Sequence, residues 1–385
     1  MLEVAIGHSV DPDTPDAAQE LIQACKKQLQ GKNPNAGILY AAIDYDFAVL
    51  LEAICAAFEG IQLIGCSTDG EASSALEFCE DSVTFIAFSS DDLEFGAGIG
   101  TGLKGDPSAA AAAAVELARA ALSSEPCIGL TTPEGLGVNG VSVVENLQGF
   151  LGAKFPLFGG LASDQSRFEG TFQFCGKEVH SNALPLLLIG GPLKYSHGVA
   201  SGWEPIGRRV FITKSERNVV HKIGDETALE YYRRYFGEQS SVSPQNPLAV
   251  FYEEGKSDFY LRAPASGNEE DQSITFFADV PEGSEVSLTR AKRSEILDGT
   301  RQSVAQAVES YPGKFPQVAL FISCNSRHHL LGTQTKLEFE ILQTELPVQT
   351  QIFGFYANGE ISPPGGGGIA VVHNKTFVTL LLGVE

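Results

Sequence analysis

A short apolar strand that runs into glycine and then into a polar turn occurs three times in this chain. The three copies are residues 62–71, 156–165 and 351–360. A helical pattern precedes each copy, and a second apolar run follows each one. Gly, Asn and Asp tolerate left-handed backbone conformations, so such turns present polar groups at strand ends. The recurrence predicts a helix, strand, turn and returning strand used three times.

The rest of the chain alternates between helical and strand-like patterns. Apolar residues at helical spacing predict helices that include residues 14–29, 46–58, 108–122 and 294–311. Short apolar runs separated by Gly and Pro after residue 164 predict antiparallel strands. The predicted fold class is therefore α/β of a mixed α+β kind, with mixed sheets covered by helices. A length of 385 residues exceeds the usual size of one core, and we expect two domains, 1–215 and 216–385.

Composition and charge limit which binding partners and which cellular compartment are expected for the protein. A net charge of −22 makes this an acidic protein and argues against nucleic acid or an anionic membrane as partner. No apolar run approaches the roughly 20 residues that cross a bilayer. The amino terminus lacks the pattern of a signal peptide, and seven cysteines contain no C-x-x-C pair. We expect a cytoplasmic protein without disulfides, without a metal site and without a cofactor.

The segment 324–329 places a thiol, a guanidinium and two imidazoles directly after a predicted strand, in what the pattern indicates is a loop. Arg327 suits a ligand carboxylate or a structural ion pair, and the sequence leaves both open. Cys324 is either a buried strand-end cysteine or a nucleophile with His328, His329 or His373 as base. Adjacent histidines point to opposite sides of an extended chain, which disfavours a metal site.

Two further patterns bear on the polar groups of the second half. Residues 335–338 read Thr-Lys-Leu-Glu and predict a capping box that opens a helix. Carboxylates recur at the three turns, where they serve either turn geometry or the binding of an ammonium group and acid/base chemistry. Glu360 follows Gly359 without any capping reason, which makes it the strongest candidate among them.

The chain resembles the FIST family, whose members combine a FIST N and a FIST C domain in signal transduction proteins. The first domain is indicated by residues 65–71 (GCSTDGE) and 158–164 (FGGLASD). The second is indicated by residues 323–327 (SCNSR), 354–363 (GFYANGEISP) and 373–376 (HNKT). The resemblance implies a sensory module that binds small ligands such as amino acids, with no established reaction. No kinase, cyclase or receptor segment accompanies these motifs, so a separate signalling protein is the expected output partner.

These observations combine into one hypothesis and two alternatives. Strand-end turns line a cleft in which Arg327 binds a ligand carboxylate and Glu360, Asp69 or Glu71 meets its ammonium group. The alternatives are a cysteine-dependent enzyme that uses Cys324 and a protein-interaction scaffold without a ligand. The full set of predicted ligand-binding residues is Arg327, Glu360, Asn358, Tyr356, Asp69, Glu71, Asp164 and Arg262.

Overall fold

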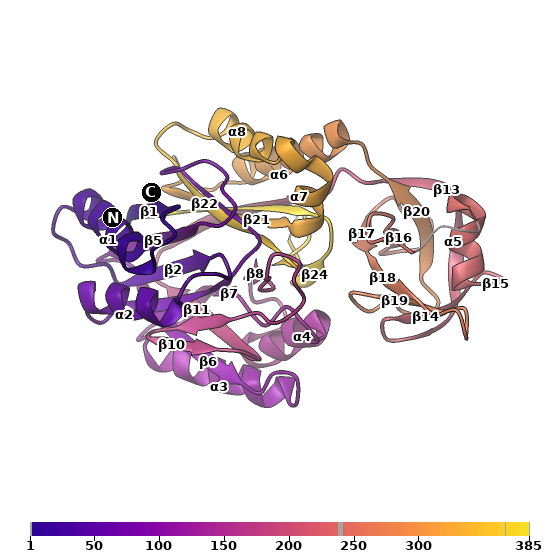
Figure 1. Cartoon of the computed structure of the whole chain (residues 1–385), viewed down its shortest axis with the longest axis horizontal. Coiled ribbons are helices and arrows are strands. Elements are labelled where there is room, and N and C mark those ends of the chain that lie inside the picture. Colours follow the sequence, from indigo (N-terminus) through magenta and orange to yellow (C-terminus); the bar gives the residue numbers. More distant parts are fainter. Residues whose placement is uncertain (1, 238–241, 366, 385) are drawn as a thin grey trace.

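The computed structural model describes residues 2–237, 242–365 and 367–384, which form a large body and a smaller lobe (Figure 1). The body holds both described chain ends and three mixed sheets with helices on their outer faces. The lobe is built from β13 to β20 and α5. Mixed sheets covered by helices confirm the predicted fold class.

The three sheets of the body repeat one strand order. In each unit the last strand lies between the first and the second strand and pairs antiparallel with both. The second strand also pairs parallel with the third. The first unit contains β1 (Leu2–Ser9), α1 (Thr14–Leu29), β2 (Ala36–Ala41), α2 (Phe47–Ala57), β3 (Gln62–Ser67) and β5 (Val83–Ser90). The second contains β6 (Glu94–Thr101), α3 (Pro107–Ala120), β7 (Pro126–Thr131), α4 (Gly140–Leu151), β8 (Leu157–Gly160) and β11 (Ala183–Gly190). The third contains β12 (Lys194–Ala200), α6 (Arg293–Glu309), β21 (Val318–Cys324), α7 (Asn325–Leu331), the 3-10 helix η1 (Gly332–Gln334), α8 (Lys336–Glu345), β22 (Gln351–Ala357) and β25 (Phe377–Gly383).

Each unit also contributes a short strand to the sheet of another unit. After the first polar turn, β4 (Glu71–Ser73) pairs with β22 of the third unit. After the second turn, β9 (Gln173–Cys175) pairs with β3 of the first unit and with β10 (Glu178–His180). After the third turn, β23 (Glu360–Ser362) pairs with β8 of the second unit and with β24 (Val371–His373). The exchange is cyclic and ties the three sheets together at their turns.

A glycine at the same position of each copy explains why the pattern repeats. A Cβ on Gly65 would lie 1.9 Å from the Leu39 carbonyl oxygen of the parallel neighbour strand. At Gly159 the corresponding distance, to the Thr131 oxygen, is 1.8 Å, and at Gly354 a Cβ would lie 2.2 Å from the oxygen of the paired residue in β21. Real Cβ atoms do not approach that closely, so each third strand requires glycine where it lies against the second. The three sheets face a shared core that includes Ile38, Leu130 and Ile322.

The lobe has its own sheet and its own core. Its elements are β13 (Glu204–Glu216), β14 (Val219–Ile223), β15 (Glu226–Thr227), α5 (Ala228–Phe236), β16 (Leu248–Phe251), β17 (Phe259–Arg262), β18 (Pro264–Gly267), β19 (Ile274–Phe276) and β20 (Glu285–Arg290). A capping box at Thr227 and Glu230 begins α5, which packs Leu229 and Tyr232 into that core. The predicted boundary between residues 215 and 216 lies inside β13, and it stays a prediction.

Helix length and composition also bear on membranes. In the described ranges, no helix combines the length and the apolar character that a bilayer crossing needs.

Candidate functional site

The three polar turns meet at the centre of the body. The Tyr356 carbonyl oxygen accepts hydrogen bonds from the Asp69 N–H at 3.2 Å and from the Ser163 hydroxyl at 3.1 Å. The Ser163 N–H donates to the Ser67 oxygen at 3.0 Å. At the third turn, the Asn358 side chain donates to the Ala162 oxygen at 3.1 Å. Asn358 and the Tyr356 backbone therefore connect the turns to one another.

Two turn carboxylates are buried here with one oxygen each left unpaired. Asp69 accepts the Gln165 N–H through Oδ1, and Asp164 accepts the N–H groups of Glu169 and Gly170 through Oδ2 at 2.8 and 3.2 Å. Asp69 Oδ2 and Asp164 Oδ1 have no hydrogen-bond partner among the described residues. Burial raises the pKa of Asp69 to about 7, and the neighbouring Asp164 charge adds to the rise.

Glu71 lies on β4 and is fully buried. The hydroxyl groups of Thr68 and Ser82 donate to its two oxygens. The Ser82 hydroxyl also lies 3.0 Å from His8 Nε2. Burial raises the pKa of Glu71 to about 8 despite these hydrogen bonds. Both carboxylate oxygens of Glu71 accept hydrogen bonds from the protein, so Glu71 is part of the interior of the body.

Arg327 is fully buried and bonded to protein acceptors through each of its three nitrogens. Nε and Nη2 donate to Glu338 Oε1 at 2.9 and 2.7 Å. Nη2 also donates to the Ile296 oxygen and the Thr300 hydroxyl, and Nη1 donates to the carbonyl oxygens of Ser201 and Lys375. A guanidinium offers five N–H donors, and the six bonds occupy them. A ligand carboxylate would have to replace some of these bonds, and the contact between Arg327 and a ligand stays a prediction.

Two local predictions around Arg327 are wrong. Residues 325–331 form α7 and not a loop. The capping box at 335–338 is not formed, because Thr335 has helical dihedrals and makes no side-chain cap. Glu338 instead lies at 1% exposure as the partner of Arg327, and its Oε2 accepts the Tyr356 hydroxyl at 2.8 Å. The Thr-x-x-Glu spacing suggested a capping box, whereas Glu338 forms a buried ion pair with Arg327. The same carboxylate also positions the Tyr356 side chain through its hydrogen bond.

A second polar cluster adjoins this ion pair and is incompletely hydrogen-bonded. Glu360 Oε2 accepts the N–H and the hydroxyl of Thr376 at 2.9 and 2.7 Å, and the Cys324 N–H donates to the Thr376 oxygen at 3.2 Å. Glu360 Oε1, Lys375 Nζ and Asn325 Oδ1 have no partner within the described residues. Burial raises the pKa of Glu360 to about 7 and that of Cys324 to about 11, whereas it lowers that of Lys375. Electrostatic interactions link all three of these titrating groups.

The three candidate histidine bases have other partners. His328 lies 2.9 Å from the Thr335 hydroxyl and 3.2 Å from a Glu80 oxygen. His329 is exposed and lies 3.2 Å from the Ser166 hydroxyl. His373 Nε2 lies 3.1 Å from the Ser362 oxygen, and burial lowers its pKa to about 4. Among the described residues, no group of three His, Cys, Asp or Glu side chains is placed to hold a metal ion.

Arg262 joins the lobe to the body. Its Nε donates to the Asp279 oxygen at 2.8 Å, and its Nη1 donates across to the Val372 oxygen of β24 at 3.1 Å. The next residue of the lobe donates its N–H to the Asn374 side chain at 3.3 Å. The guanidinium also lies 4.3 Å from the centre of the Tyr260 ring. The structure thus places Arg262 at the lobe contact and apart from the three turns.

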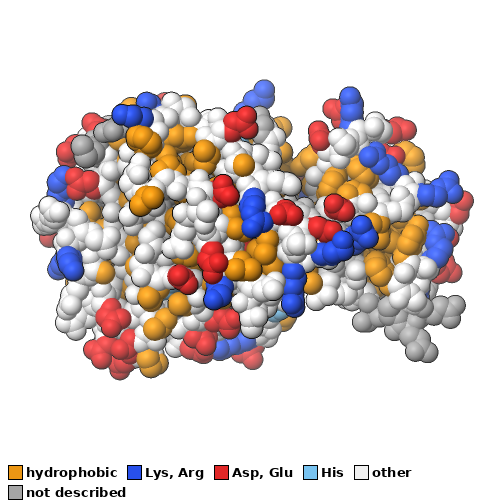
Figure 2. Space-filling model, turned by 90° about the horizontal axis from the view of Figure 1, so that it is seen from above, with side chains coloured by type: hydrophobic (Ala, Val, Ile, Leu, Met, Phe, Trp, Pro, Cys, Tyr) orange, Lys and Arg blue, Asp and Glu red, His pale blue; other side chains and the backbone are white. Residues whose placement is uncertain are grey.

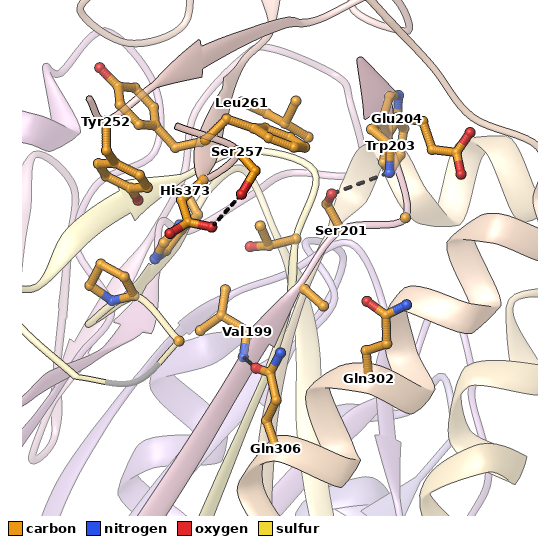
Figure 3. Close-up of a pocket in the computed structure, with 18 of the residues that line it drawn as sticks. Val199, Ser201, Trp203, Glu204, Tyr252, Ser257, Leu261, Gln302, Gln306 and His373 are labelled. Atoms are coloured by element: carbon orange, nitrogen blue, oxygen red, sulfur yellow. Dashed lines mark hydrogen bonds between the residues drawn. The ribbon is translucent and has the colours of Figure 1, made fainter. Parts of the chain in front are cut away.

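A cavity of about 820 Å³ lies between the body and the lobe, beside this contact (Figure 3). Gln302 and Gln306 of α6 line it from one side, and the Gln306 side chain accepts the Val199 N–H at 3.0 Å. The segment that contains Tyr252 and Ser257 lines it from the lobe. In the space-filling view the molecule narrows between its larger and smaller parts (Figure 2).

Carboxylates and aromatic rings dominate the chemistry of the cavity. Among the described lining residues, Lys256 is the one lysine or arginine, whereas five carboxylates line the space: Glu204, Glu253, Asp258, Glu295 and Asp298. Three of the five pair with Arg290, Lys292 and Arg301 outside the lining. Glu253 and Asp258 have no ion pair within the described part of the chain. Trp203 and Tyr252 add aromatic surface.

The cavity and the incomplete cluster are neighbours. Thr376 lines the cavity and holds Glu360, and Trp203 lines it with its ring centre 5.8 Å from Lys375 Nζ. Sequence reasoning missed Lys375, Trp203 and the lobe segment 252–261. A lysine between two apolar strands was the available signal for Lys375, whereas the cavity depends on tertiary packing.

Comparison with known proteins agrees with this architecture. The model of the FIST N domain matches residues 35–226, and that of the FIST C domain matches residues 228–363. FIST domains are sensory domains of signal transduction. The chain belongs to the FIST family, as its motifs predicted.

Individual relatives are distant. An uncharacterized protein of Methanocaldococcus jannaschii is 26% identical over 200 residues, which cover 48% of this chain and 38% of that protein. The match thus spans less than half of the relative's length. Among solved structures, the chain is similar to a cyanuic acid hydrolase from A. caulinodans at 10% identity and a TM-score of 0.41, over 99% of both chains.

Proposed function

We propose that this protein is a sensor that binds a small amine-bearing ligand, such as an amino acid, in the cavity between its body and its lobe. The observation that carries the proposal is the 820 Å³ space with its carboxylate and aromatic lining. Small-molecule sites commonly are concave, lie between domains and combine apolar surface with a few polar groups.

The lining suggests how such a ligand would be held. The carboxylates of Glu253 and Asp258 are suited to an ammonium group, and the rings of Trp203 and Tyr252 offer faces for cation–π contacts. Lys256, from the same lobe segment, is suited to a carboxylate. An amino acid carries both charges, which makes it the favoured class.

Binding in this position suggests a way to signal. A ligand that bridges body and lobe favours the arrangement in which both sides contact it, and it therefore shifts the population toward that arrangement. We propose that a separate partner protein detects the shift. We also propose a cytoplasmic location, which is supported by the free state of all seven cysteines.

The single tryptophan gives a direct test, because Trp203 lines the cavity. The expected result is a saturable change in tryptophan emission and a rise in melting temperature with amino acids or amines at millimolar concentration. N-acetylated versions of the same compounds should bind more weakly, because they lack the ammonium group.

Two variants make the test specific to the lining. The double variant Glu253→Gln/Asp258→Asn should weaken binding at least about tenfold, because it removes both unpaired carboxylates. Glu116→Gln, on an exposed position of α3, is the matched control and should bind normally. If amino acids and amines change neither the emission nor the melting temperature of the intact protein, the proposal is wrong.

A further inference from the structure

Strand β17 is an edge strand of the lobe sheet, and it borders the cavity between body and lobe. Among the described strands, it pairs with β16 alone. The consecutive residues 258–261 all line the cavity. Successive side chains of a strand point to opposite faces of its sheet, so a cavity that contacts each residue in turn lies along the edge of the strand and not over one face. The cavity therefore borders the unpaired backbone of β17.

The hydrogen bonds of the hairpin show which backbone groups of β17 point away from β16. The Tyr252 N–H donates to the Asp258 oxygen at 3.0 Å across the ladder. Hydrogen-bonded and non-hydrogen-bonded pairs alternate along an antiparallel ladder, so Phe259 and Leu261 direct their N–H and C=O groups outward. The Leu261 oxygen accepts a hydrogen bond from the Arg262 side chain at 3.1 Å. The two outward N–H groups and the Phe259 oxygen stay available for a further strand.

The cavity has the dimensions of a short extended peptide. One face of α6 forms its wall on the body side, at Glu295, Asp298, Gln302 and Gln306. Between the first and the last of these residues the helix rises about 16 Å, at about 1.5 Å per residue. An extended chain rises about 3.4 Å per residue, so four or five residues match this length. The volume of 820 Å³ lies near the upper end of the roughly 300–1,000 Å³ of ligand pockets, and one free amino acid would fill only part of it.

We propose that the ligand of this cavity is a short peptide of about four residues, which adds a strand to the edge of β17. This inference rests on the proposed sensor function and names its ligand class. The main-chain groups of the peptide pair with the outward groups of Phe259 and Leu261, as in other cases of β-strand addition. A free amino acid lacks a series of backbone amides and binds more weakly.

The other walls of the cavity supply contacts for the rest of the peptide. Glu253 and Asp258, which have no ion pair within the described residues, are suited to its ammonium end. The carboxamide of Gln302 is directed into the space from α6, where it donates to and accepts from peptide groups that face away from β17 (Figure 3). Tyr252 and Tyr260, with ring centres 5.0 Å apart, offer apolar surface to the peptide side chains.

Isothermal titration calorimetry of the intact protein with alanine, dialanine, trialanine and tetra-alanine tests the ligand class. Affinity should rise at least about tenfold from dialanine to tetra-alanine, because each added residue brings further backbone hydrogen bonds. Equal affinities along this series would overturn the proposal. The Glu253→Gln/Asp258→Asn variant should bind tetra-alanine at least about tenfold more weakly. Unchanged binding by that variant would place the peptide outside the cavity and would also overturn it.

N-methylated tetra-alanines test the pairing with a strand edge. Neighbouring N–H groups of an extended peptide point to opposite sides, so only one of two successive amides faces β17. Methylation at the second or the third nitrogen should therefore have unequal effects. One methyl group should weaken binding at least about tenfold, and the other should weaken it less than about threefold. Equal effects of the two methyl groups would contradict the pairing.

A variant of β17 makes the same test from the side of the protein. Phe259→Pro removes one outward N–H at a strand edge, where proline is tolerated, and should weaken tetra-alanine binding at least about tenfold. Phe259→Ala is the matched control, because it removes the ring and keeps the N–H, and it should bind within about threefold of the wild type. Wild-type affinity in a folded Phe259→Pro protein would refute the assignment to β17. The methylated peptides use the wild-type chain, so they decide the question even if Phe259→Pro does not fold.

The results also separate this inference from the sensor proposal. Free alanine that binds as tightly as tetra-alanine would retain the sensor and remove the peptide. Tetra-alanine that binds with unequal methyl effects, while amino acids and amines give no response, would retain the peptide site and remove amino acids as the ligand. No response to any of these compounds would remove both.

Discussion

Two buried cations, Arg327 and Lys375, lie next to each other near the junction of body and lobe, and they differ in how completely they are hydrogen-bonded. Arg327 fills its donors with protein acceptors and pairs with Glu338. Lys375, whose carbonyl oxygen accepts one of the Arg327 bonds, leaves its own Nζ without a partner in the described chain. Burial of a charge alone therefore does not indicate a function. A complete set of hydrogen bonds indicates a structural role, whereas an incomplete set indicates a candidate functional position.

The strongest test of this contrast is Arg327→Met. Removal of the guanidinium leaves Glu338 buried without its counter-charge, which typically costs about 3–5 kcal/mol. Urea unfolding should show a loss of that size in the free energy of unfolding. The double variant Arg327→Met/Glu338→Leu should recover much of the loss, since neither charge then remains. A loss below about 1 kcal/mol in the single variant would contradict the structural role.

The pH dependence of stability provides the next largest effect. The pKa of Glu360 is about 7 in the folded state, against roughly 4.3 for an unperturbed glutamate. Between these values the folded state binds more protons, so stability falls as pH rises, by at most about 1.4 kcal/mol per pH unit for one carboxyl. The decline should start near pH 4 and end above pH 7. Asp69 and Glu71 titrate in the same direction.

Urea unfolding at pH 5, 6, 7 and 8 measures this slope. Glu360→Gln should make it shallower, because one of the titrating groups is gone, and the exposed Glu116→Gln should not. Equal slopes in the wild type and Glu360→Gln would show that Glu360 titrates normally in the folded protein.

The smallest expected effect is that of Lys375→Met. Because the amine has no protein partner, replacing it by an apolar side chain of similar length removes a desolvated charge and loses no hydrogen bond. The free energy of unfolding should stay within about 1 kcal/mol of the wild type or rise. Destabilisation as large as that of Arg327→Met would show that both cations are structural.

The three-fold repeat was predictable from the sequence because its cause is local. Each copy needs glycine where the strand lies against its parallel neighbour, and it needs a polar turn directly after. The cyclic exchange of β4, β9 and β23 was not predictable, because these strands have only three residues each and pair with partners distant in the sequence.

The site was harder to predict than the fold. Glu338 lies three residues after Thr335, which is the spacing of a capping box. It instead forms a buried ion pair with Arg327, which depends on the packing of α6, α7 and α8. The cavity could not be predicted for a related reason, since its walls come from four separate stretches of the sequence, within residues 199–204, 252–261, 295–306 and 364–376. In the structure the Glu360 carboxylate accepts hydrogen bonds from Thr376, and the expected contact of Glu360 with a ligand stays a prediction.

The exchange of strands also has a consequence for how the protein is made. β4 ends at Ser73, and the strand it pairs with begins at Gln351. During synthesis, the first sheet emerges long before the edge that will receive β4 exists. An unpaired strand on a nascent chain invites pairing with the wrong partner. The pairing of β4 therefore waits until β22 has left the ribosome, and a chain truncated before β22 is expected to need chaperones.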